Sequence, residues 1–247
     1  MTFRVYQEKL HYEKTNPLLW LYDKLFPLPA VCPVCMKPQA RLGVCEKCRA
    51  EVLRKRSMYG QCKRCSSFGV YSDACRNCRE WPAYYRGNIA IWPYQGAYKQ
   101  VIKEFKFHNM PWLADALAQE VLLYLPEGYE LLVPVPLHAN RLQERSYNQS
   151  ELLVRSLSRM SGMPWQNCLE RVRDTPHQTG LGRAERLQNL HNAFDLHKGV
   201  NVQGKKIILI DDVFTTGTTL LSCARVLHQH GAQEIVSCTL ASGQARF

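Results

Sequence analysis

The 247-residue sequence predicts an α/β fold in which a parallel sheet follows a small cysteine-rich region. Strand-like and helix-like segments alternate from residue 89 onward, which is typical of a parallel sheet with helices on its faces. Eight of the 11 cysteines lie between Cys32 and Cys78, in two copies of one spacing. A boundary is therefore expected near residue 85, in a chain long enough for two modest domains.

The two cysteine copies, C-x2-C-x9-C-x2-C, begin thirty residues apart and form an internal repeat. A C-x-x-C knuckle turns two sulfurs toward one ion, and a second knuckle completes the tetrahedron that Zn²⁺ prefers. Four thiolates leave no open position, which predicts a structural rather than a catalytic site. The expected ligands are Cys32, Cys35, Cys45, Cys48, Cys62, Cys65, Cys75 and Cys78.

A redox dithiol is the alternative use of C-x-x-C, but that motif normally occurs singly at the start of a helix in a βαβ unit. The spacing leaves open whether each repeat binds its own ion or whether knuckles pair across the repeats. Because the region has few large apolar residues, we expect it to need the metal to fold.

The net charge of +11 is concentrated in the cysteine-rich part of the chain. Residues 1–90 hold 16 Lys and Arg against 7 Asp and Glu, a balance of +9. Two filled zinc sites would reduce that balance to about +5, because four thiolates around one Zn²⁺ carry a net charge of −2. The excess indicates either a solvated surface or attraction to a polyanion such as nucleic acid.

Residues 1–30 lack the features of a signal peptide, and no apolar run approaches membrane-spanning length, so a cytoplasmic protein is expected. Basic residues between the knuckles and on one helical face are candidate DNA contacts. They are Arg54, Lys55, Arg56, Lys99, Lys103 and Lys106. Tyr59, Phe68, Tyr71 and Trp81 are candidates for stacking on unpaired bases.

The alternating segments follow in a regular order. Strands are expected over residues 88–94, 129–137, 205–211 and 234–241, and helices over residues 96–109, 111–125, 148–162 and 218–231. In the first helix, Tyr98, Val101, Ile102 and Phe105 share one apolar face. Gly231 stands at the stop position of the last helix.

The stretch "IILIDDVFTTGTTL" contains the candidate ligand site. Ligands of parallel sheets bind beyond the carboxyl ends of the strands, where Asp211 and Asp212 are expected. The backbone amides of residues 215–219 and the following helix N-terminus suit a phosphate. Because two carboxylates would repel that phosphate, we expect them to bind sugar hydroxyls. The cradle comprises Thr215, Thr216, Gly217, Thr218 and Thr219.

These residues resemble the phosphoribosyl pyrophosphate (PRPP) motif of type I phosphoribosyltransferases. The double cysteine knuckles, "YQGAYKQVIKEFKF", "VPVPLHANRLQERSYNQSELLV" and "RVRDTPHQTGLGRAERLQNLHNAF" are similar to the ComF family, which includes ComFC and GntX-like proteins. The resemblance implies a parallel-sheet type I phosphoribosyltransferase fold preceded by a small zinc-ribbon domain. Residues 1–26 would form an N-terminal extension, 27–85 the double zinc ribbon and 86–247 the phosphoribosyltransferase-like domain.

The resemblance also implies roles for further residues. Asp211 and Asp212 would bind the ribose hydroxyls and serve as the catalytic pair, and the threonine loop would bind the 5′-phosphate. Arg141 and Arg145 are candidates to hold pyrophosphate together with Mg²⁺. Residues 171–189 resemble a hood over the site, although an exposed loop is the alternative. This segment includes Arg171, Arg173, Thr175, Gln178, Arg183 and Arg186.

Three functions are compatible with these features. The resemblance implies a protein of natural transformation that binds PRPP and single-stranded DNA, with a DNA-translocation helicase as a candidate partner. The alternative is an active phosphoribosyltransferase with an unidentified acceptor. Purine-type enzymes carry an acidic residue where this chain has Thr215, which argues against purine salvage. A third hypothesis is a regulator in which PRPP sets the conformation of the zinc module.

Overall fold

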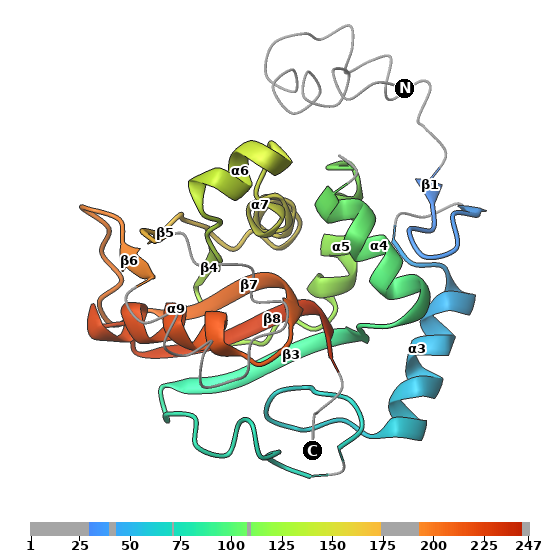
Figure 1. Cartoon of the computed structure of the whole chain (residues 1–247), viewed down its shortest axis with the longest axis horizontal. Coiled ribbons are helices and arrows are strands. Elements are labelled where there is room, and N and C mark those ends of the chain that lie inside the picture. The colour runs from blue at the N-terminus through green and yellow to red at the C-terminus, as the bar shows by residue number, and fades with distance from the viewer. Residues whose placement is uncertain (1–29, 40–42, 71, 108–109, 174–192, 244–247) are drawn as a thin grey trace, which may run out of the picture.

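A computed structural model describes residues 30–39, 43–70, 72–107, 110–173 and 193–243 (Figure 1). Its centre is a four-stranded sheet in the order β3-β8-β7-β4, with all neighbours parallel. The strands are β3 (Tyr85–Pro93), β4 (Leu131–Pro134), β7 (Lys206–Phe214) and β8 (Glu234–Ser242). The predicted alternation of strand and helix is therefore confirmed, and the parallel α/β fold with it.

The two faces of the sheet have separate cores. On β7, Ile207 and Leu209 join the core that includes helix α9 (Thr218–Gln229), whereas Ile208 and Ile210 join the opposite core. Helices α4 (Gly96–Phe107), α5 (Leu113–Leu122) and α7 (Gln149–Ser161) cover that opposite face (Figure 1). All four residues of the Ile207–Ile210 stretch are fully buried, as a strand covered on both faces requires.

The helix boundaries follow recognisable end signals. The side chain of Asn148 accepts a hydrogen bond from the backbone N–H of Ser150 at the start of α7, and Gly162 ends that helix with a left-handed φ of 74°. The four apolar residues predicted for the buried face of α4 are the four that are buried there. Helix α6 (Ala139–Arg145) and the short antiparallel pair β5 (Leu169–Arg171) and β6 (Phe194–Leu196) complete the sheet domain.

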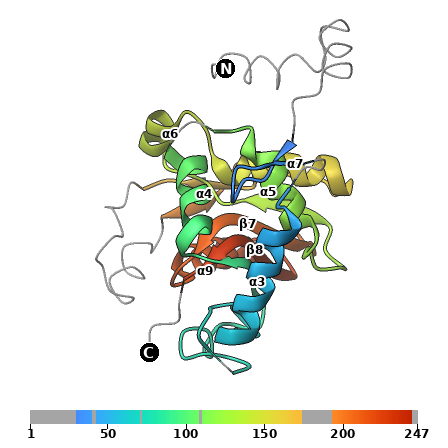
Figure 2. The ribbon, with the colours of Figure 1, turned by 90° about the vertical axis from the view of Figure 1, so that its right-hand side faces the viewer.

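The cysteine-rich region contains a helix that its sequence did not predict. A two-stranded ladder of β1 (Ala30–Val31) and β2 (Pro38–Gln39) precedes α3 (Glu46–Tyr59). Figures 1 and 2 show α3 along the edge of the molecule, reaching from the side of α4 to the loops of the second repeat. The helix begins within the first repeat, whose last cysteine is Cys48, and leads to the second repeat.

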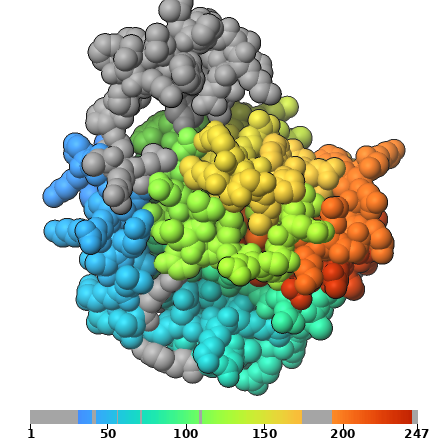
Figure 3. Space-filling model, turned by 180° about the vertical axis from the view of Figure 1, so that it is seen from behind, coloured from blue at the N-terminus to red at the C-terminus, as the bar shows by residue number. Residues whose placement is uncertain are grey.

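The second repeat covers the edge of the sheet at β3. The backbone N–H of Asn88 donates to the carbonyl of Arg64 at 2.9 Å, which satisfies a polar group that an edge strand would otherwise expose. A Cβ at Gly87 would lie 2.1 Å from the Arg64 carbonyl oxygen, so only glycine allows this approach. Figure 3 shows the cyan surface of this repeat continuous with the green surface of the sheet domain.

The described helices include none that is both long and apolar enough to cross a membrane.

The cysteine-rich region packs against the sheet domain through both of its repeats.

Candidate metal centres and phosphate-binding site

Each cysteine repeat gathers its own four sulfurs. One group comprises Cys32, Cys35, Cys45 and Cys48, and the other comprises Cys62, Cys65, Cys75 and Cys78. Within each group the ligand atoms all lie within 4.8 Å of one another. Knuckles therefore pair within a repeat rather than across repeats, which resolves the alternative that the spacing left open.

The donor sets fit zinc. A tetrahedral Zn²⁺ site with Zn–S bonds of about 2.3 Å requires sulfur–sulfur separations of about 3.8 Å. The Sγ atoms of Cys35 and Cys45 are 3.8 Å apart, and those of Cys75 and Cys78 are 3.7 Å apart. None of the 11 cysteines forms a disulfide. The chemistry and spacing of both donor sets therefore fit zinc.

The two groups share one local geometry. The backbone N–H of Cys45 points at Cys32 Sγ at 3.4 Å, and the equivalent N–H of Cys75 points at Cys62 Sγ at 3.3 Å. Such N–H groups favour the thiolate form that binds metal. The second group is fully buried, whereas three of the four cysteines in the first are half-buried.

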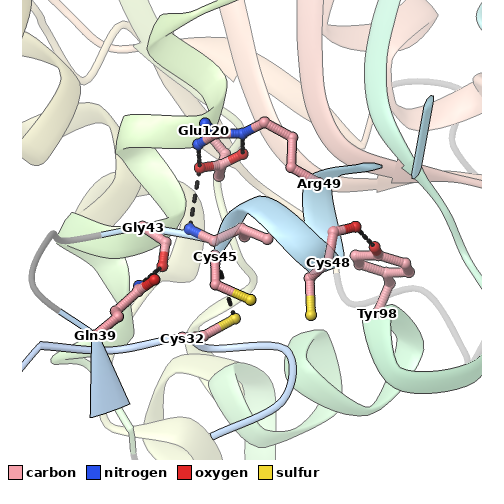
Figure 4. Close-up of polar contacts among 9 residues, drawn as sticks. Cys32, Gln39, Gly43, Cys45, Cys48, Arg49, Tyr98 and Glu120 are labelled. Carbon is pink, nitrogen blue, oxygen red and sulfur yellow. Dashed lines mark hydrogen bonds and ion pairs between the residues drawn. The ribbon is translucent and has the colours of Figure 1, made fainter. Parts of the chain in front are cut away.

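A buried carboxylate anchors the first group to the sheet domain (Figure 4). Glu120 on α5 accepts hydrogen bonds from Arg49 Nη2 at 2.6 Å and from the backbone N–H of Val44 at 3.1 Å. On the opposite side, the Tyr98 hydroxyl donates to the carbonyl of Cys48 at 2.6 Å. The metal knuckle is therefore held by α4 and α5 together.

The second group leads directly to the threonine loop. Arg64 donates to the carbonyls of Cys78 at 3.0 Å and Trp81 at 2.9 Å, which fixes the segment that follows the last cysteine. The Trp81 ring packs edge-on against Phe214 at the end of β7, with centroids 5.8 Å apart. Trp81 is 6% exposed and Phe68 is 2% exposed. The expectation that these two rings stack on bases is therefore wrong, because the core of the protein already covers them.

Gly217 gives the threonine loop its shape. Its φ of 77° lies in the left-handed region, and a Cβ there would lie 2.7 Å from Phe214 Cε2 and 3.0 Å from Trp81 Cζ2. The Thr216 and Thr218 hydroxyls lie 2.8 Å apart. The start of α9 has no side-chain cap, so the loop provides hydroxyls and helix N–H groups in one place.

The aspartate pair lies beside this loop, near the end of β7. Asp211 Oδ1 accepts from Ser150 Oγ at 3.2 Å and from the Asp212 backbone N–H at 2.9 Å. Burial, followed by the neighbouring Asp212 carboxylate, raises the pKa of Asp211 to about 7. Asp212 Oδ1 lies 2.7 Å from Lys106 Nζ, and these side chains are only 11% and 16% exposed.

Arg145 lies near both aspartates. Burial lowers its pKa, and the charges of Asp212 and Asp211 oppose that shift. Its guanidinium covers the Phe107 ring at 4.7 Å, and Nη1 donates to Gln149 Oε1 at 3.3 Å. Its Nε is buried and has no hydrogen-bond partner among the residues that the structure describes. Arg141, the other candidate for pyrophosphate, is half-buried on α6.

The candidate DNA contacts lie in different environments. Arg54 and Lys55 are 3.7 and 3.2 Å from Glu51 on α3, and the Arg56 side chain lies outside the description. On α4, Lys99 covers the Tyr94 ring at 5.7 Å, and Lys103 is exposed. Lys106 is mostly buried, and its ammonium group pairs with Asp212.

The first residue of the expected hood, Arg171, pairs with Phe194 in the β5–β6 ladder. Arg173 is exposed just beyond β5. Thr175, Gln178, Arg183 and Arg186 lie outside the described residues, as does Tyr71. The sequence did not predict that Ser150 and Gln149 contact Asp211 and Arg145. An asparagine cap indicates where a helix starts, but it does not indicate which polar residues of the first turn are buried.

Comparison with known proteins identifies a phosphoribosyl transferase domain over residues 113–246. Competence protein F of Haemophilus influenzae is 32% identical over 207 residues, covering 79% of this chain and 89% of its own. DNA utilization protein YhgH of Salmonella typhimurium is 32% identical over 225 residues, covering 85% and 96%. Competence protein ComFC of Bacillus subtilis is 30% identical over 212 residues, covering 82% and 84%.

Solved structures show more distant similarity. Glutamine PRPP amidotransferase of B. subtilis, complexed with ADP and GMP, is 19% identical with a TM-score of 0.39; the match covers 56% of this chain and only 30% of that chain. A hypoxanthine phosphoribosyltransferase of Staphylococcus aureus is 15% identical with a TM-score of 0.33, covering 56% and 69%. At these identities, the likeness concerns the fold alone.

Proposed function

Because the chain belongs to the phosphoribosyl transferase domain family, in the branch that contains competence protein F, ComFC and YhgH, we propose that it binds PRPP and single-stranded DNA in natural transformation. The observation that carries PRPP binding is the aspartate pair beside an uncapped, hydroxyl-rich helix start at the end of a central strand. Each part of that arrangement suits a different part of the ligand.

The threonine loop suits the 5′-phosphate, since hydroxyls and helix N–H groups donate to phosphate oxygens without requiring a fixed cation. The carboxylates of Asp211 and Asp212 suit the ribose diol, because an ionised carboxylate only accepts hydrogen bonds and hydroxyls donate them. Arg145 suits the pyrophosphate, since its buried Nε is a donor that still lacks an acceptor within the described part of the chain. Arg141 is proposed as a second pyrophosphate contact.

Oxygen donors of the aspartate pair also fit Mg²⁺, which would neutralise pyrophosphate charge when bound with PRPP. Zinc in the two cysteine groups would be structural, since each set of four sulfurs leaves no place for substrate. The metal would hold the Cys78 end of the second repeat, from which Trp81 reaches the threonine loop.

The proposed DNA surface is basic and includes α3. Arg54 and Lys55 share a single acidic partner, Glu51, which leaves a surplus of positive charge on this exposed helix. Exposed ion pairs are weak enough to exchange for phosphate contacts. Lys99 and Lys103 extend the proposed surface to α4. Lys106 is omitted from it, because its ammonium group is already paired within the aspartate site.

An active phosphoribosyltransferase with an unidentified acceptor is the second candidate. The complete aspartate and threonine motif favours it, as does Asp211, whose carboxyl has a pKa raised to about 7. In such a reaction the acceptor would bond to C1 of the ribose as the C1–pyrophosphate bond breaks and pyrophosphate leaves with the bonding electrons, and a carboxylate would stabilise the oxocarbenium-like transition state. Release of pyrophosphate in the presence of a candidate acceptor would distinguish turnover from binding.

DNA binding is tested by fluorescence anisotropy of labelled single-stranded DNA with the variant Arg54→Glu/Lys55→Glu/Arg56→Glu. We expect the variant to bind more weakly, with a shallower dependence of affinity on salt, because each lost phosphate contact changes the slope by about 0.7. Arg155→Glu/Lys198→Glu/Lys205→Glu makes the same charge change on other elements. Equal losses in both triple variants would show that net charge, and not the α3 surface, governs binding.

A further inference from the structure

Lys106 and Asp212 form a largely enclosed ion pair in the phosphate-binding region. The ammonium and the carboxylate are 2.7 Å apart, and neither side chain is more than 16% exposed. A pair so shielded from water is stronger than a surface pair, yet it uses the carboxylate that the proposed function assigns to the ribose diol. The lysine occupies Asp212 Oδ1, so a ribose diol that takes both oxygens of this carboxylate competes with the lysine.

The end of α4 that carries Lys106 is fixed next to Arg145. Gln149 Nε2 donates to the Lys106 carbonyl at 3.3 Å, while its Oε1 accepts from Arg145 Nη1 at 3.3 Å. The Tyr147 hydroxyl donates to the carbonyl of Phe105 at 2.5 Å. One amide side chain therefore joins the backbone of Lys106 to the guanidinium of Arg145, and Asp212 interacts electrostatically with both cations.

The two cations match the two carboxylates in charge. The pair of Asp211 and Asp212 carries up to −2, and Lys106 with Arg145 carries +2, so this group is balanced without a ligand. Pyrophosphate brings several further negative charges. The buried Nε of Arg145, which has no acceptor among the described residues, independently indicates that an acceptor group belongs beside it.

We propose that Lys106 is a pyrophosphate-binding residue that pairs with Asp212 while the site is empty and transfers its ammonium group to the ligand when the ribose diol takes over Asp212. This inference rests on the proposed binding of PRPP. Lysine suits such an exchange, because its ammonium is a compact charge with three donors on a flexible stem. The pair also keeps two adjacent carboxylates from repelling the incoming phosphates.

The test compares Lys106→Met, Lys106→Arg and the control Lys198→Met, which removes an exposed lysine just after β6 that has no assigned binding role. Calorimetry in Mg²⁺ would measure the affinity of each protein for PRPP, inorganic pyrophosphate and ribose 5-phosphate. We expect Lys106→Met to weaken the binding of PRPP and of pyrophosphate by about 10- to 100-fold, because one charge-assisted contact is lost. Ribose 5-phosphate should bind equally or more tightly, since Asp212 is released. Lys106→Arg should recover part of the lost affinity, and Lys198→Met should match the wild type.

Asp212→Asn provides a second test that keeps the lysine. It should weaken ribose 5-phosphate while leaving pyrophosphate binding intact or improved, and it remains informative if Lys106→Met fails to fold. Unchanged or tighter PRPP binding by Lys106→Met would overturn the inference, because the lysine would then only compete with the ligand. An equal loss of affinity for all three ligands in Lys106→Met would also overturn the inference. If the wild type binds none of them, the proposed function fails and this inference falls with it.

Discussion

Replacing Gly217 by alanine tests how tightly the threonine loop is built into the core. Two costs are expected. An L-residue at φ 77° costs about 1–2 kcal/mol. The added Cβ would also lie 2.7 Å from the Phe214 ring and 3.0 Å from the Trp81 ring, and overpacking of this kind costs about 1–3 kcal/mol. The free energy of unfolding should therefore fall by about 2–5 kcal/mol.

Gly162→Ala is the matched control. Gly162 has a φ of 74°, but nothing lies within 4 Å of its hypothetical Cβ, so only the backbone cost applies. Urea unfolding of the zinc-loaded proteins would measure both variants. The Gly217 variant should lose about 1–3 kcal/mol more than the control, and Phe214→Leu should relieve part of that excess. Equal losses in the two glycine variants would refute the claim that Phe214 and Trp81 enclose the loop.

Three further predictions concern the metal groups and the aspartates. Cys78→Ser should halve the zinc content measured by metal analysis, because each repeat gathers its own ligands, whereas Cys168→Ser, outside both groups, should leave it unchanged. Glu120→Gln should lower the free energy of unfolding by about 1.5–3 kcal/mol. The loss should be near the low end of this range, because the partner Arg49 is 42% exposed. An unchanged free energy of unfolding would mean that the carboxylate does not anchor the first repeat. The raised pKa of Asp211 should make PRPP bind more tightly as pH rises through about 7, since only the carboxylate accepts from both hydroxyls. Because the pKa of Asp211 in the folded protein exceeds the unfolded value of about 3.9, the free energy of unfolding of the ligand-free protein should fall as the pH rises from about 4 to about 7. Asp211→Asn should abolish the pH dependence both of PRPP binding and of stability.

Local patterns predicted the sheet domain well because its elements are regular. The buried strand at Ile207–Ile210 and the buried face of α4 follow from periodicity alone, and the start of α9 follows from the glycine that precedes it. The end of β7 was predicted too early. The strand continues through the aspartates to Phe214, because β8 pairs with it as far as Ser242.

Contacts between distant segments could not be predicted from the same patterns. Helix α3 was not predicted because its sequence lacks an apolar stripe at helical spacing: Val52 is buried, whereas Leu53, Met58 and Tyr59 are exposed. Trp81 looked like a surface ring in a polar segment, and only the folded chain brings it against Phe214. Lys106 lies outside the apolar stripe of α4, and the sequence of one helix does not show that its lysine will meet a carboxylate near the end of a strand.

The most direct test of the central claim is calorimetric titration of the zinc-loaded protein with PRPP in Mg²⁺, beside Asp211→Asn/Asp212→Asn. Micromolar binding by the wild type that is lost in the double variant is the predicted result, because the aspartates are assigned to the ribose hydroxyls. Equal binding by both proteins would contradict that assignment. An absence of binding in both would contradict PRPP as the ligand of this site and leave DNA as the ligand to pursue.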